Sequence, residues 1–494
     1  MISQTMATDT GTIEHAAAIV GDALRSVGYS ETGVVDLLGD DAYSGGAEEV
    51  PLNDRMLPDT KLATMVRAFF LLLPVPADDA VSALGRDAVD SLEAAGLADV
   101  GDEVIPRVRI LPVDELYVAA DGFSRDVDDP PDYVAAYTPT ARLLDTLTPR
   151  RRVERALDVG TGSGIHALRA AAHARHVIAT DVNPRALEFT RLNAALNGLT
   201  NIEVRQGSLF EPVEGETFDL IACNAPYVVS PERRWAYRDA GGKADEVSER
   251  VVAESAAHLA EGGFATMLVS WVAEDEDEPD ERVVAWAERT GCDSWILVAE
   301  ESDPLGHAAA WNSHLAGDPE AFGAALDEWA RYLDELGVRW VSDGAVILKR
   351  RAGGRPTVRV DSIDEDDVEE ASEQIERAFE TRARLEELGR NDLLEASLSV
   401  AMPLRLEHEL EPTADAPVPT DAVAALAAGT NSAIETTPDA LEILGLLDGE
   451  TPLEDVVDAV ADSRELDDDE LREFRRDVLD LCDELLELGA LRLD

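Results

Sequence analysis

Three glycines on one short loop give the clearest chemical signal in this chain. An apolar run ends in Asp158-Val, and the loop after it reads Gly-Thr-Gly-Ser-Gly before a helical pattern begins at Ile165. The loop residues that we expect to contact a ligand are Gly160, Thr161, Gly162 and Gly164. Glycine lets a backbone turn sharply and a ligand approach closely, and the following helix presents free N–H groups. The pattern favours a nucleotide-type cofactor over a purely structural turn, with Asp158 able to accept from a charged amino group.

A second carboxylate lies at the distance along the sequence that is typical of ribose binding. The run His176-Val-Ile-Ala-Thr-Asp181 is a strand pattern, and Asp181 lies 21 positions after Gly160. In a strand–helix–strand unit this offset brings a carboxylate to ribose hydroxyls, where it accepts two hydrogen bonds from the diol. Asn183-Pro184 starts the next helix, so a surface acid at that helix start is the alternative interpretation.

A tetrapeptide suited to nitrogen chemistry follows another strand pattern. Phe218–Cys223 runs directly into Asn224-Ala225-Pro226-Tyr227. An amide or aromatic amine nitrogen is a poor nucleophile because its lone pair is delocalised. The Asn224 side-chain oxygen and the Ala225 carbonyl can accept both N–H bonds of an NH2 group, which directs that lone pair at an incoming group. Pro226 biases Ala225 toward an extended conformation, and Tyr227 can stack on the planar acceptor. The alternative is an ordinary turn, where Asn and Pro are common.

These motifs require a scaffold that brings strand ends together, and residues 131–351 supply the pattern. The predicted strands are Ala156–Gly160, Val177–Asp181, Ile202–Gln206, Phe218–Cys223, Phe264–Ser270, Ser294–Ala299 and Trp340–Lys349. The predicted helices are Ile165–His173, Pro184–Leu196, Glu246–Leu259 and Pro319–Leu336. This alternation predicts an α/β domain with a parallel, doubly wound sheet covered on both faces. In such a sheet, ligands bind at the carboxyl ends of the strands, where the strand order reverses.

The regions on either side of this pattern indicate smaller domains. Residues 1–130 carry helical patterns followed by two short alternating runs, Glu103–Leu111 and Asp114–Val118, which suggest a winged-helix-like unit. Residues 355–494 are acidic and helical, and a second winged-helix-like unit fits their end. The expected domains are therefore 1–130, 131–351 and 355–494.

The motifs together resemble a known family. Asp158–Ile165, Asp181 and Asn224–Tyr227 look like the class I S-adenosylmethionine (SAM)-dependent methyltransferases of the small-domain type. That group includes release-factor glutamine methyltransferases and ribosomal-RNA guanine N-methyltransferases. The resemblance covers residues 131–351 and implies a Rossmann-like domain with a mostly parallel, seven-stranded sheet. The family signature is Asn-Pro-Pro-Tyr/Phe, and Ala225 here replaces the first proline; its carbonyl can keep the role.

The resemblance implies SAM as the cofactor and direct methyl transfer to nitrogen, without a metal or a covalent intermediate. The implied cofactor contacts are Asp158, Gly160, Thr161, Gly162, Gly164, Asp181, Ser208, Leu209 and Asn224. The implied acceptor contacts are Asn224, Ala225, Pro226 and Tyr227. Relatives often carry an acid where Ser208 stands, near the adenine. Backbone N–H groups of Ser208 or Leu209 are therefore expected to contact the ring here.

The charge balance is the most unusual bulk property of the chain. Its formal net charge is -60, with 102 acidic and 42 basic residues. A solvated acidic surface suited to a salt-rich, halophilic cytoplasm explains this better than a cationic partner, because net charge governs solubility more than chemistry. Such a chain repels nucleic acid unless arginines gather locally. Two such clusters, each beside a predicted site element, are candidates for RNA contact, with arginines paired to acids as the alternative. They include Arg150, Arg151, Arg152, Arg233 and Arg234.

Composition also excludes several classes. No apolar run is long enough to span a bilayer, and the first residues lack a secretory signal pattern. Three widely spaced cysteines disfavour a disulfide framework or a zinc ribbon, so a cytoplasmic protein is expected. No residue spacing indicates a metal site.

Three functions remain open from the sequence. The first is an N-methyltransferase acting on a protein glutamine, and the second is one acting on an exocyclic base amine of RNA or DNA, since both acceptors present a planar NH2 group. The third is a non-catalytic scaffold that binds SAM. A nicotinamide-dependent oxidoreductase is opposed by the Asn-Ala-Pro-Tyr segment and by a glycine spacing that departs from G-x-G-x-x-G.

Overall fold

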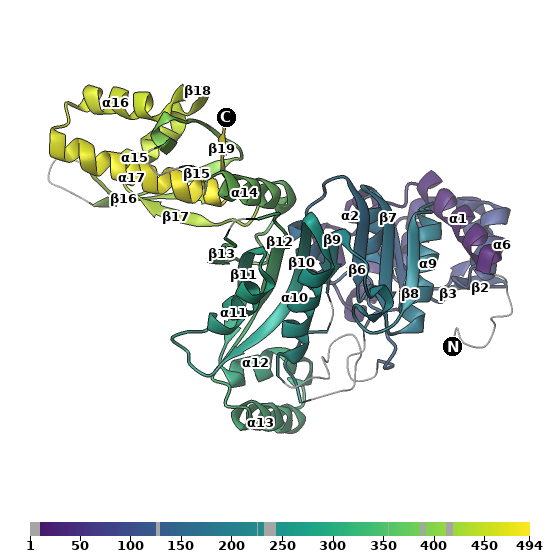
Figure 1. The fold of residues 1–494 in the computed structure, drawn as a ribbon. Coiled ribbons are helices and arrows are strands. Elements are labelled where there is room, and N and C mark those ends of the chain that lie inside the picture. Colours follow the sequence, from purple (N-terminus) through teal and green to yellow (C-terminus); the bar gives the residue numbers. More distant parts are fainter. Residues whose placement is uncertain are drawn as a thin grey trace.

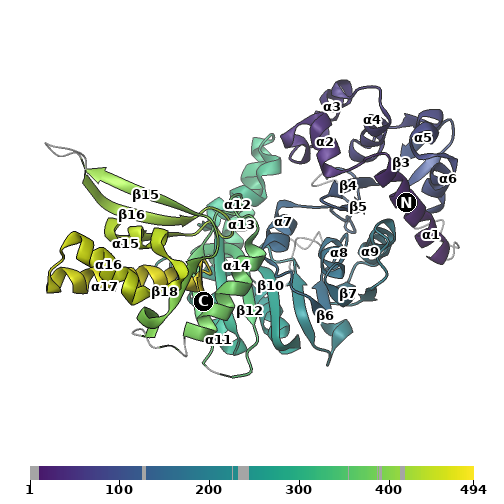
Figure 2. The ribbon, with the colours of Figure 1, turned by 90° about the horizontal axis from the view of Figure 1, so that it is seen from above.

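The computed structural model arranges the chain as three units in a row, with a large sheet in the middle (Figure 1). The residues that the structure describes are 10–124, 129–224, 226–231, 244–353, 355–385, 388, 392–411 and 418–494. The N-terminal unit packs against one end of the central domain, and the C-terminal unit lies at the other end (Figures 1 and 2).

The central sheet has eight strands in the order β13-β11-β12-β10-β9-β6-β7-β8. Their bounds are β6 Val153–Val159, β7 Ala174–Asp181, β8 Ile202–Gln206, β9 Phe218–Cys223, β10 Leu259–Ala273, β11 Asp293–Ser302, β12 Trp340–Lys349 and β13 Val358–Ser362. All neighbours are parallel except β12, which runs antiparallel to both β10 and β11. The predicted mostly parallel, doubly wound fold is confirmed, and the sheet has one strand more than the expected seven.

The strand order reverses beside β6, which places three predicted motifs together at one edge of the sheet, the edge formed by the carboxyl ends of the parallel strands. Val159 at the end of β6 pairs with Thr180 of β7 and with Cys223 of β9. Gly160, Asp181 and Asn224 are the next residues on these three neighbouring strands. This is the position where open α/β sheets bind ligands.

Helices cover both faces of the sheet. One face packs against α7 (Pro139–Leu147), α8 (Ile165–Ala171) and α14 (Ala371–Leu385), through a core that joins side chains of these helices to Phe264 and Trp295. The other face packs against α10 (Glu246–His258) and α11 (Glu281–Thr290). Figure 2 shows α7 and α14 over the strands.

The strands β10, β11 and β12 extend beyond the edge at which β9 ends. Cys223 pairs with Met267, yet β10 continues to Ala273, which pairs with Trp340 of β12. The helices α12 (Pro304–Trp311) and α13 (Pro319–Glu335) are inserted between β11 and β12. Leu333 of α13 belongs to the same buried cluster as residues of this extension and of the segment after Asn224.

The N-terminal unit is mostly helical. Its helices are α1 Thr10–Ser26, α2 Glu31–Leu38, α3 Val50–Met56, α4 Lys61–Met65, α5 Ala77–Leu84 and α6 Arg86–Ala94, and its strands are β1 Val75–Pro76, β2 Ala98–Val100, β3 Glu103–Pro106, β4 Arg109–Val113 and β5 Leu116–Ala120. It docks on α9 (Pro184–Leu196), where the buried Asn193 amide donates to the Ala119 carbonyl at 2.8 Å and accepts from the Ala119 N–H at 2.7 Å. The sheet order β1-β3-β2 after two helices is compatible with a winged-helix-like unit, which stays a prediction.

The C-terminal unit contains more strand than its composition indicated. Its helices beyond α14 are α15 Pro438–Ile443, α16 Leu453–Arg464 and α17 Asp468–Glu487, and its strands are β14 Ser397–Val400, β15 Leu404–Glu411, β16 Val418–Leu426, β17 Ala433–Thr436, β18 Asp448–Pro452 and β19 Leu491–Leu493. The strands form two three-stranded sheets, β18-β14-β19 and β15-β16-β17. No helix in the described part of the chain is long and apolar enough to cross a membrane.

Candidate active site

The glycine loop leaves the end of β6 in a conformation that favours glycine at three positions. Gly160, Gly162 and Gly164 have φ of 71°, 54° and 89°. A side chain at Gly164 would meet the Thr190 methyl carbon Cγ2 at 2.9 Å, so this glycine lets α8 pack on α9. A side chain at Gly162 would meet nothing within 4 Å. The loop therefore has an open side at Gly162, where a ligand can lie against the backbone.

Asp158 is buried beneath this loop, where one of its carboxylate oxygens accepts hydrogen bonds and the other has no donor among the described residues. Its Oδ2 accepts from the Thr161 hydroxyl at 2.6 Å and from the Ala167 N–H at 3.0 Å. Its Oδ1 is buried and accepts no hydrogen bond from the residues that the structure describes. Burial raises the pKa of Asp158, and the nearby His166 opposes that rise. A buried carboxylate oxygen without a donor is costly, and a ligand ammonium group would satisfy it.

Asp181 ties the end of β7 to the loop. Its Oδ2 accepts from the Gly162 N–H at 3.0 Å, and its Oδ1 accepts from the Asn183 N–H at 2.8 Å. Burial raises the pKa of Asp181, and the charge of Asp158 adds to the rise. Each carboxylate oxygen has two lone pairs, so these two bonds leave acceptor capacity for ribose hydroxyls.

The segment after β8 lies beside Asp181. The Gly207 N–H donates to the Asp181 carbonyl at 3.0 Å, and the Thr180 hydroxyl donates to the Leu209 carbonyl at 3.3 Å. Ser208 and Leu209 are half-buried, and Leu209 has a φ of 48°. The segment thus brings the two residues expected near adenine to the edge that holds the glycine loop.

Asn224 and Tyr227 share a partner that the sequence did not indicate. The Asn224 Nδ2 donates to the Thr140 hydroxyl at 3.5 Å, from a residue 84 positions away. Thr140 also hydrogen-bonds the Tyr227 side chain, and it lies in the first turn of α7, 2.9 Å from the Thr138 hydroxyl. The Asn224 Oδ1 accepts no hydrogen bond from a described residue, so it is available to an acceptor N–H.

Three acidic side chains, two from the sheet extension and one from the segment after β13, lie close enough to Tyr227 to affect its pKa. Burial raises the pKa of Tyr227 far above its usual range, and the charges of Asp343, Glu365 and Glu300 add to the rise, so the phenol stays protonated. Burial also raises the pKa of Asp343 to about 6, although the Ser270 hydroxyl donates to it. The side of the edge next to Tyr227 is therefore rich in carboxylates.

Part of the predicted site lies elsewhere or outside the described residues. Ala225, Arg233 and Arg234 lie outside them, and so do the aromatic residues between 232 and 243. Pro226 is described and half-buried. The predicted arginines Arg150, Arg151 and Arg152 precede β6, so they lie at the opposite end of that strand from Gly160. The structure does not bring them to the edge that holds Asn224.

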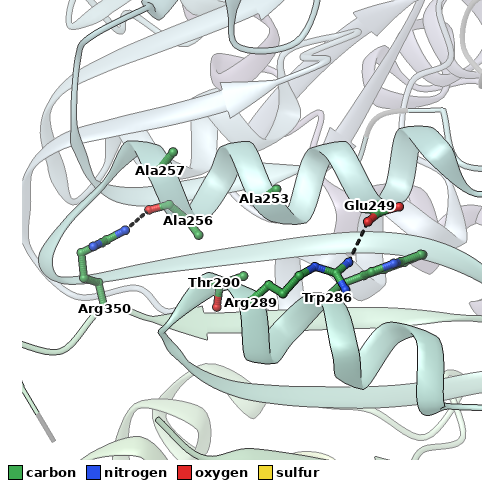
Figure 3. Close-up of a pocket in the computed structure, with 8 residues that line it drawn as sticks. All are labelled: Glu249, Ala253, Ala256, Ala257, Trp286, Arg289, Thr290 and Arg350. Atoms are coloured by element: carbon green, nitrogen blue, oxygen red, sulfur yellow. Dashed lines mark hydrogen bonds and ion pairs between the residues drawn. The ribbon is translucent and has the colours of Figure 1, made fainter. Parts of the chain in front are cut away.

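A cavity of about 300 Å³ lies between α10 and α11, away from this edge (Figure 3). Its charged groups are already engaged: Arg289 pairs with Glu249 at 2.7 Å, and Arg350 donates to the Ala256 carbonyl. Arg350 directly follows β12 and pairs with the start of β10, which is the end of the sheet remote from the glycine loop. This cavity holds none of the residues predicted for the cofactor or the acceptor.

The buried Asp158 gives a pH-dependent prediction. Because burial raises its native pKa above the ordinary 3.8, ionised Asp158 costs native-state stability increasingly as pH rises through that pKa. Asp158→Asn keeps an acceptor for Thr161 and Ala167 but carries no charge. Relative to the unsubstituted protein, we expect the unfolding free energy of the variant to rise as pH increases from about 4 to 7, measured by denaturant titration.

The same variant should bind SAM about 10- to 100-fold more weakly, as expected when a hydrogen bond between charged groups is lost. Isothermal titration at pH 7 measures this affinity. Unchanged affinity, or a stability difference that does not vary with pH, would show that Asp158 does not have the assigned role.

Comparison with known proteins matches the domain seen here. Residues 138–275 match the family model of the methyltransferase small domain, and residues 26–109 match a domain of unknown function (DUF7059). A release factor glutamine methyltransferase from Deinococcus radiodurans is 42% identical over 127 residues, which cover 23% of this chain and 45% of that protein. A ribosomal protein uL3 glutamine methyltransferase from Bordetella pertussis is 34% identical over 191 residues, covering 34% of this chain and 60% of that protein.

These similarities concern the central domain. The chain spans about half the length of the glutamine methyltransferases that it matches. A ribosomal protein L11 methyltransferase from Lactobacillus acidophilus is 48% identical over 69 residues, or 14% of this chain and 22% of that protein. The matched region contains the glycine loop, Asp181 and Asn224 on adjacent strand ends. Residues 138–275 of this chain therefore match the methyltransferase small-domain family, and the similarities support a class I SAM methyltransferase domain in this region.

Proposed function

We propose that this chain transfers a methyl group from SAM to a planar amide nitrogen, and that the acceptor is a protein glutamine. The observation that carries the proposal is the register of three strands: Gly160, Asp181 and Asn224 follow paired residues on β6, β7 and β9. The glycine loop proposed to hold the cofactor and the Asn224 Oδ1, which accepts no hydrogen bond from a described residue, thus lie at the same edge of the sheet. The relatives named glutamine methyltransferases support an amide acceptor.

The residues of this edge fit SAM. When bound, SAM supplies a methyl group on a positively charged sulfur. The orphan Oδ1 of Asp158 suits the ammonium group of the methionine portion. The open side of Gly162 admits the ligand against the backbone, and the remaining lone pairs of Asp181 suit the ribose diol. Ser208 and Leu209 line the adjoining turn, where their N–H groups can contact adenine.

The acceptor nitrogen needs orientation rather than a strong base. Because Thr140 accepts from the Asn224 Nδ2, the Asn224 Oδ1 is left to accept an N–H from the substrate amide. The Ala225 carbonyl would accept the second N–H, and neutral Tyr227 would stack on the amide plane. As the nitrogen–methyl bond forms, the carbon–sulfur bond breaks and the nitrogen loses one proton to solvent. Positioning supplies most of the rate in such a transfer.

The charges near Tyr227 favour a protein acceptor over a nucleic acid. An exocyclic base amine presents the same planar NH2 group, so the motif alone does not separate the two. Asp343, Glu300 and Glu365 lie close enough to raise the pKa of Tyr227, and each would repel a phosphodiester. A glutamine side chain brings no such charge.

Transfer of a labelled methyl group from SAM into a cell extract at high potassium chloride tests this function. We expect label in a protease-sensitive fraction with the unsubstituted chain and none above background with Asn224→Ala. Label that is removed by RNase instead would assign a base amine. Absence of Asn224-dependent label in both fractions would favour a scaffold that binds SAM without transferring its methyl group.

Thr140 gives a second test of the acceptor geometry. Thr140→Val replaces the hydroxyl with a methyl group of similar size, so we expect kcat to fall about tenfold, while the Kd for SAM stays unchanged. Thr140→Ser should restore kcat because it returns the hydroxyl. Thr146→Val, on the same helix, is the matched control, since the Thr146 hydroxyl donates only to the Arg142 carbonyl. If Thr140→Val and Thr146→Val behave alike, Thr140 does not orient Asn224.

We infer a cytoplasmic, salt-adapted setting for this activity. The net charge of -60 suits a solvated surface in concentrated salt, and the three cysteines form no disulfide.

A further inference from the structure

An arginine-lined groove lies at the junction of the central and C-terminal units. It has a volume of about 550 Å³ and lies between α14, the residues before β6, and β19. Five of its lining residues are arginines, in a chain with 102 acidic and 42 basic residues. They are Arg150, Arg151, Arg377, Arg384 and Arg492. Such a concentration of positive charge departs from the composition of the chain.

Most of these guanidinium groups have no carboxylate partner. Arg150 pairs with Asp145 at 3.1 Å. Within the described ranges, Arg151, Arg377 and Arg492 make no ion pair of 4.0 Å or less. By contrast, Arg359 on nearby β13 contacts three carboxylates at 2.6 to 3.0 Å. The three arginines of the groove therefore differ from Arg359, whose charge is balanced by carboxylates.

Backbone carbonyls hold two of the arginines in place. The Arg377 Nε donates to the Gly489 carbonyl at 2.6 Å, and the Arg384 guanidinium donates to the Leu493 carbonyl at 2.9 Å. Burial lowers the pKa of Arg377, and the positive charge of Arg492 lowers it further. The charge of Glu373 opposes this effect only in part, and an anion in the groove would relieve the remaining repulsion between the two like charges.

Carboxylates of α14 also line the groove. Glu373, Glu376 and Glu380 line it together with the five arginines. Arg151 lies close enough to lower the pKa of Glu376, which burial raises. In concentrated salt, charges more than a few ångströms apart are screened, because the Debye length falls to about 3 Å at 1 M. The contacts inside the groove therefore decide its selectivity more than the net charge of the whole chain does.

We propose that this groove binds phosphate groups, which occur along an RNA strand or on a nucleoside triphosphate. Arginine is suited to phosphate because its planar fork donates two parallel hydrogen bonds. The groove is not the reaction centre: Arg151 precedes β6, and Gly160 follows it, so the seven-residue strand separates them by about 20 Å. The site is therefore an anchor remote from Asn224, and it does not depend on the proposed methyl transfer.

Fluorescence anisotropy with a short labelled oligoribonucleotide tests the site, with ATP and inorganic phosphate as competitors. The variant Arg377→Gln/Arg492→Gln removes two unpaired charges of the groove. We expect it to weaken RNA binding at least about tenfold and to reduce the slope of log affinity against log salt by about 1.4, or 0.7 per lost contact. Arg86→Gln/Arg331→Gln removes the same charge from exposed positions on α6 and α13 and should bind as the unsubstituted chain does.

The competitors identify the source of the phosphate. If only unlabelled RNA displaces the labelled RNA, the ligand is an RNA strand. If ATP displaces it at similar concentrations, the ligand is a nucleotide. Equal binding by the groove variant and the control variant, or no binding of RNA, ATP or phosphate, would overturn the proposal. Arg492→Gln alone changes an exposed side chain, so it keeps the test valid if the double variant fails to fold.

Discussion

Replacing Asn224 by alanine is expected to lower kcat for methyl transfer about 10²- to 10³-fold while changing the Kd for SAM much less. The loss equals that found when one oriented hydrogen-bonding group is removed from a reaction centre. Asn224 follows β9 directly, and its Nδ2 is held by Thr140, so its Oδ1 is the acceptor that alanine deletes. Single-turnover transfer from labelled SAM measures kcat, and isothermal titration measures the Kd.

Two further variants define what Asn224 contributes. Asn224→Asp keeps the shape and an acceptor oxygen but loses the donor to Thr140, so we expect activity between that of alanine and asparagine. Cys223→Ala changes the neighbouring buried residue and should leave kcat within about threefold of the starting value, since its side chain faces the core. A Cys223 effect as large as that of Asn224 would shift the chemistry to the thiol and contradict the assignment.

Gly162→Val is expected to raise the Kd for SAM at least about 100-fold. Valine at a φ of 54° is strained, and its side chain would fill the open side of the loop. The Gly162 N–H also donates to Asp181, so a shift of the loop would disturb the residue assigned to the ribose. Equilibrium dialysis with labelled SAM provides the affinity.

Backbone strain alone would also destabilise the fold, and Gly198→Val controls for that effect. Gly198 has a φ of 67° and follows α9, and a side-chain carbon there, as at Gly162, would meet nothing within 4 Å. We expect both variants to lose about 1–3 kcal/mol of unfolding free energy, while only Gly162→Val loses SAM binding. Equal SAM affinities in the two variants would mean that the glycine loop does not hold the cofactor.

The sequence predicts the central sheet well because its strands are short apolar runs bounded by turns. The predicted bounds of Ile202–Gln206, Phe218–Cys223 and Trp340–Lys349 are those of β8, β9 and β12, and Pro184–Leu196 is α9. Buried parallel strands carry this signal in their own residues, and Asn183-Pro184 marks the helix start. The reversal beside β6 then follows from the chain order of a doubly wound fold.

The remaining strands lacked such a signal. β13 is five residues long and half-buried, next to a run of acids, so its pairing with β11 depends on a partner far away in the sequence. β15 has seven exposed positions and is rich in glutamate, a residue depleted in strands. These strands are defined by their partners more than by their own composition.

The candidate site was predictable where a residue lies at the end of its own strand, and not where a contact crosses the fold. Gly162, Asp181 and Asn224 have a recognisable spacing from their strands. Thr140 lies 84 positions from Asn224, and its only local signal is the helix start at Thr138-Pro139. The acidic surroundings of Tyr227 depend on how far β10 and β12 extend past β9, which only the pairing of the strands reveals.

The most direct test of the central claim is mass spectrometry of the protein that becomes labelled in the extract. The account predicts one added methyl group on the side-chain amide of a glutamine, present with the unsubstituted chain and absent with Asn224→Ala. A methyl group on a carboxylate, a lysine or a nucleobase, still dependent on Asn224, would contradict the amide acceptor while leaving the SAM site intact. A methylated glutamine that persists with Asn224→Ala would contradict the role of this edge of the sheet altogether.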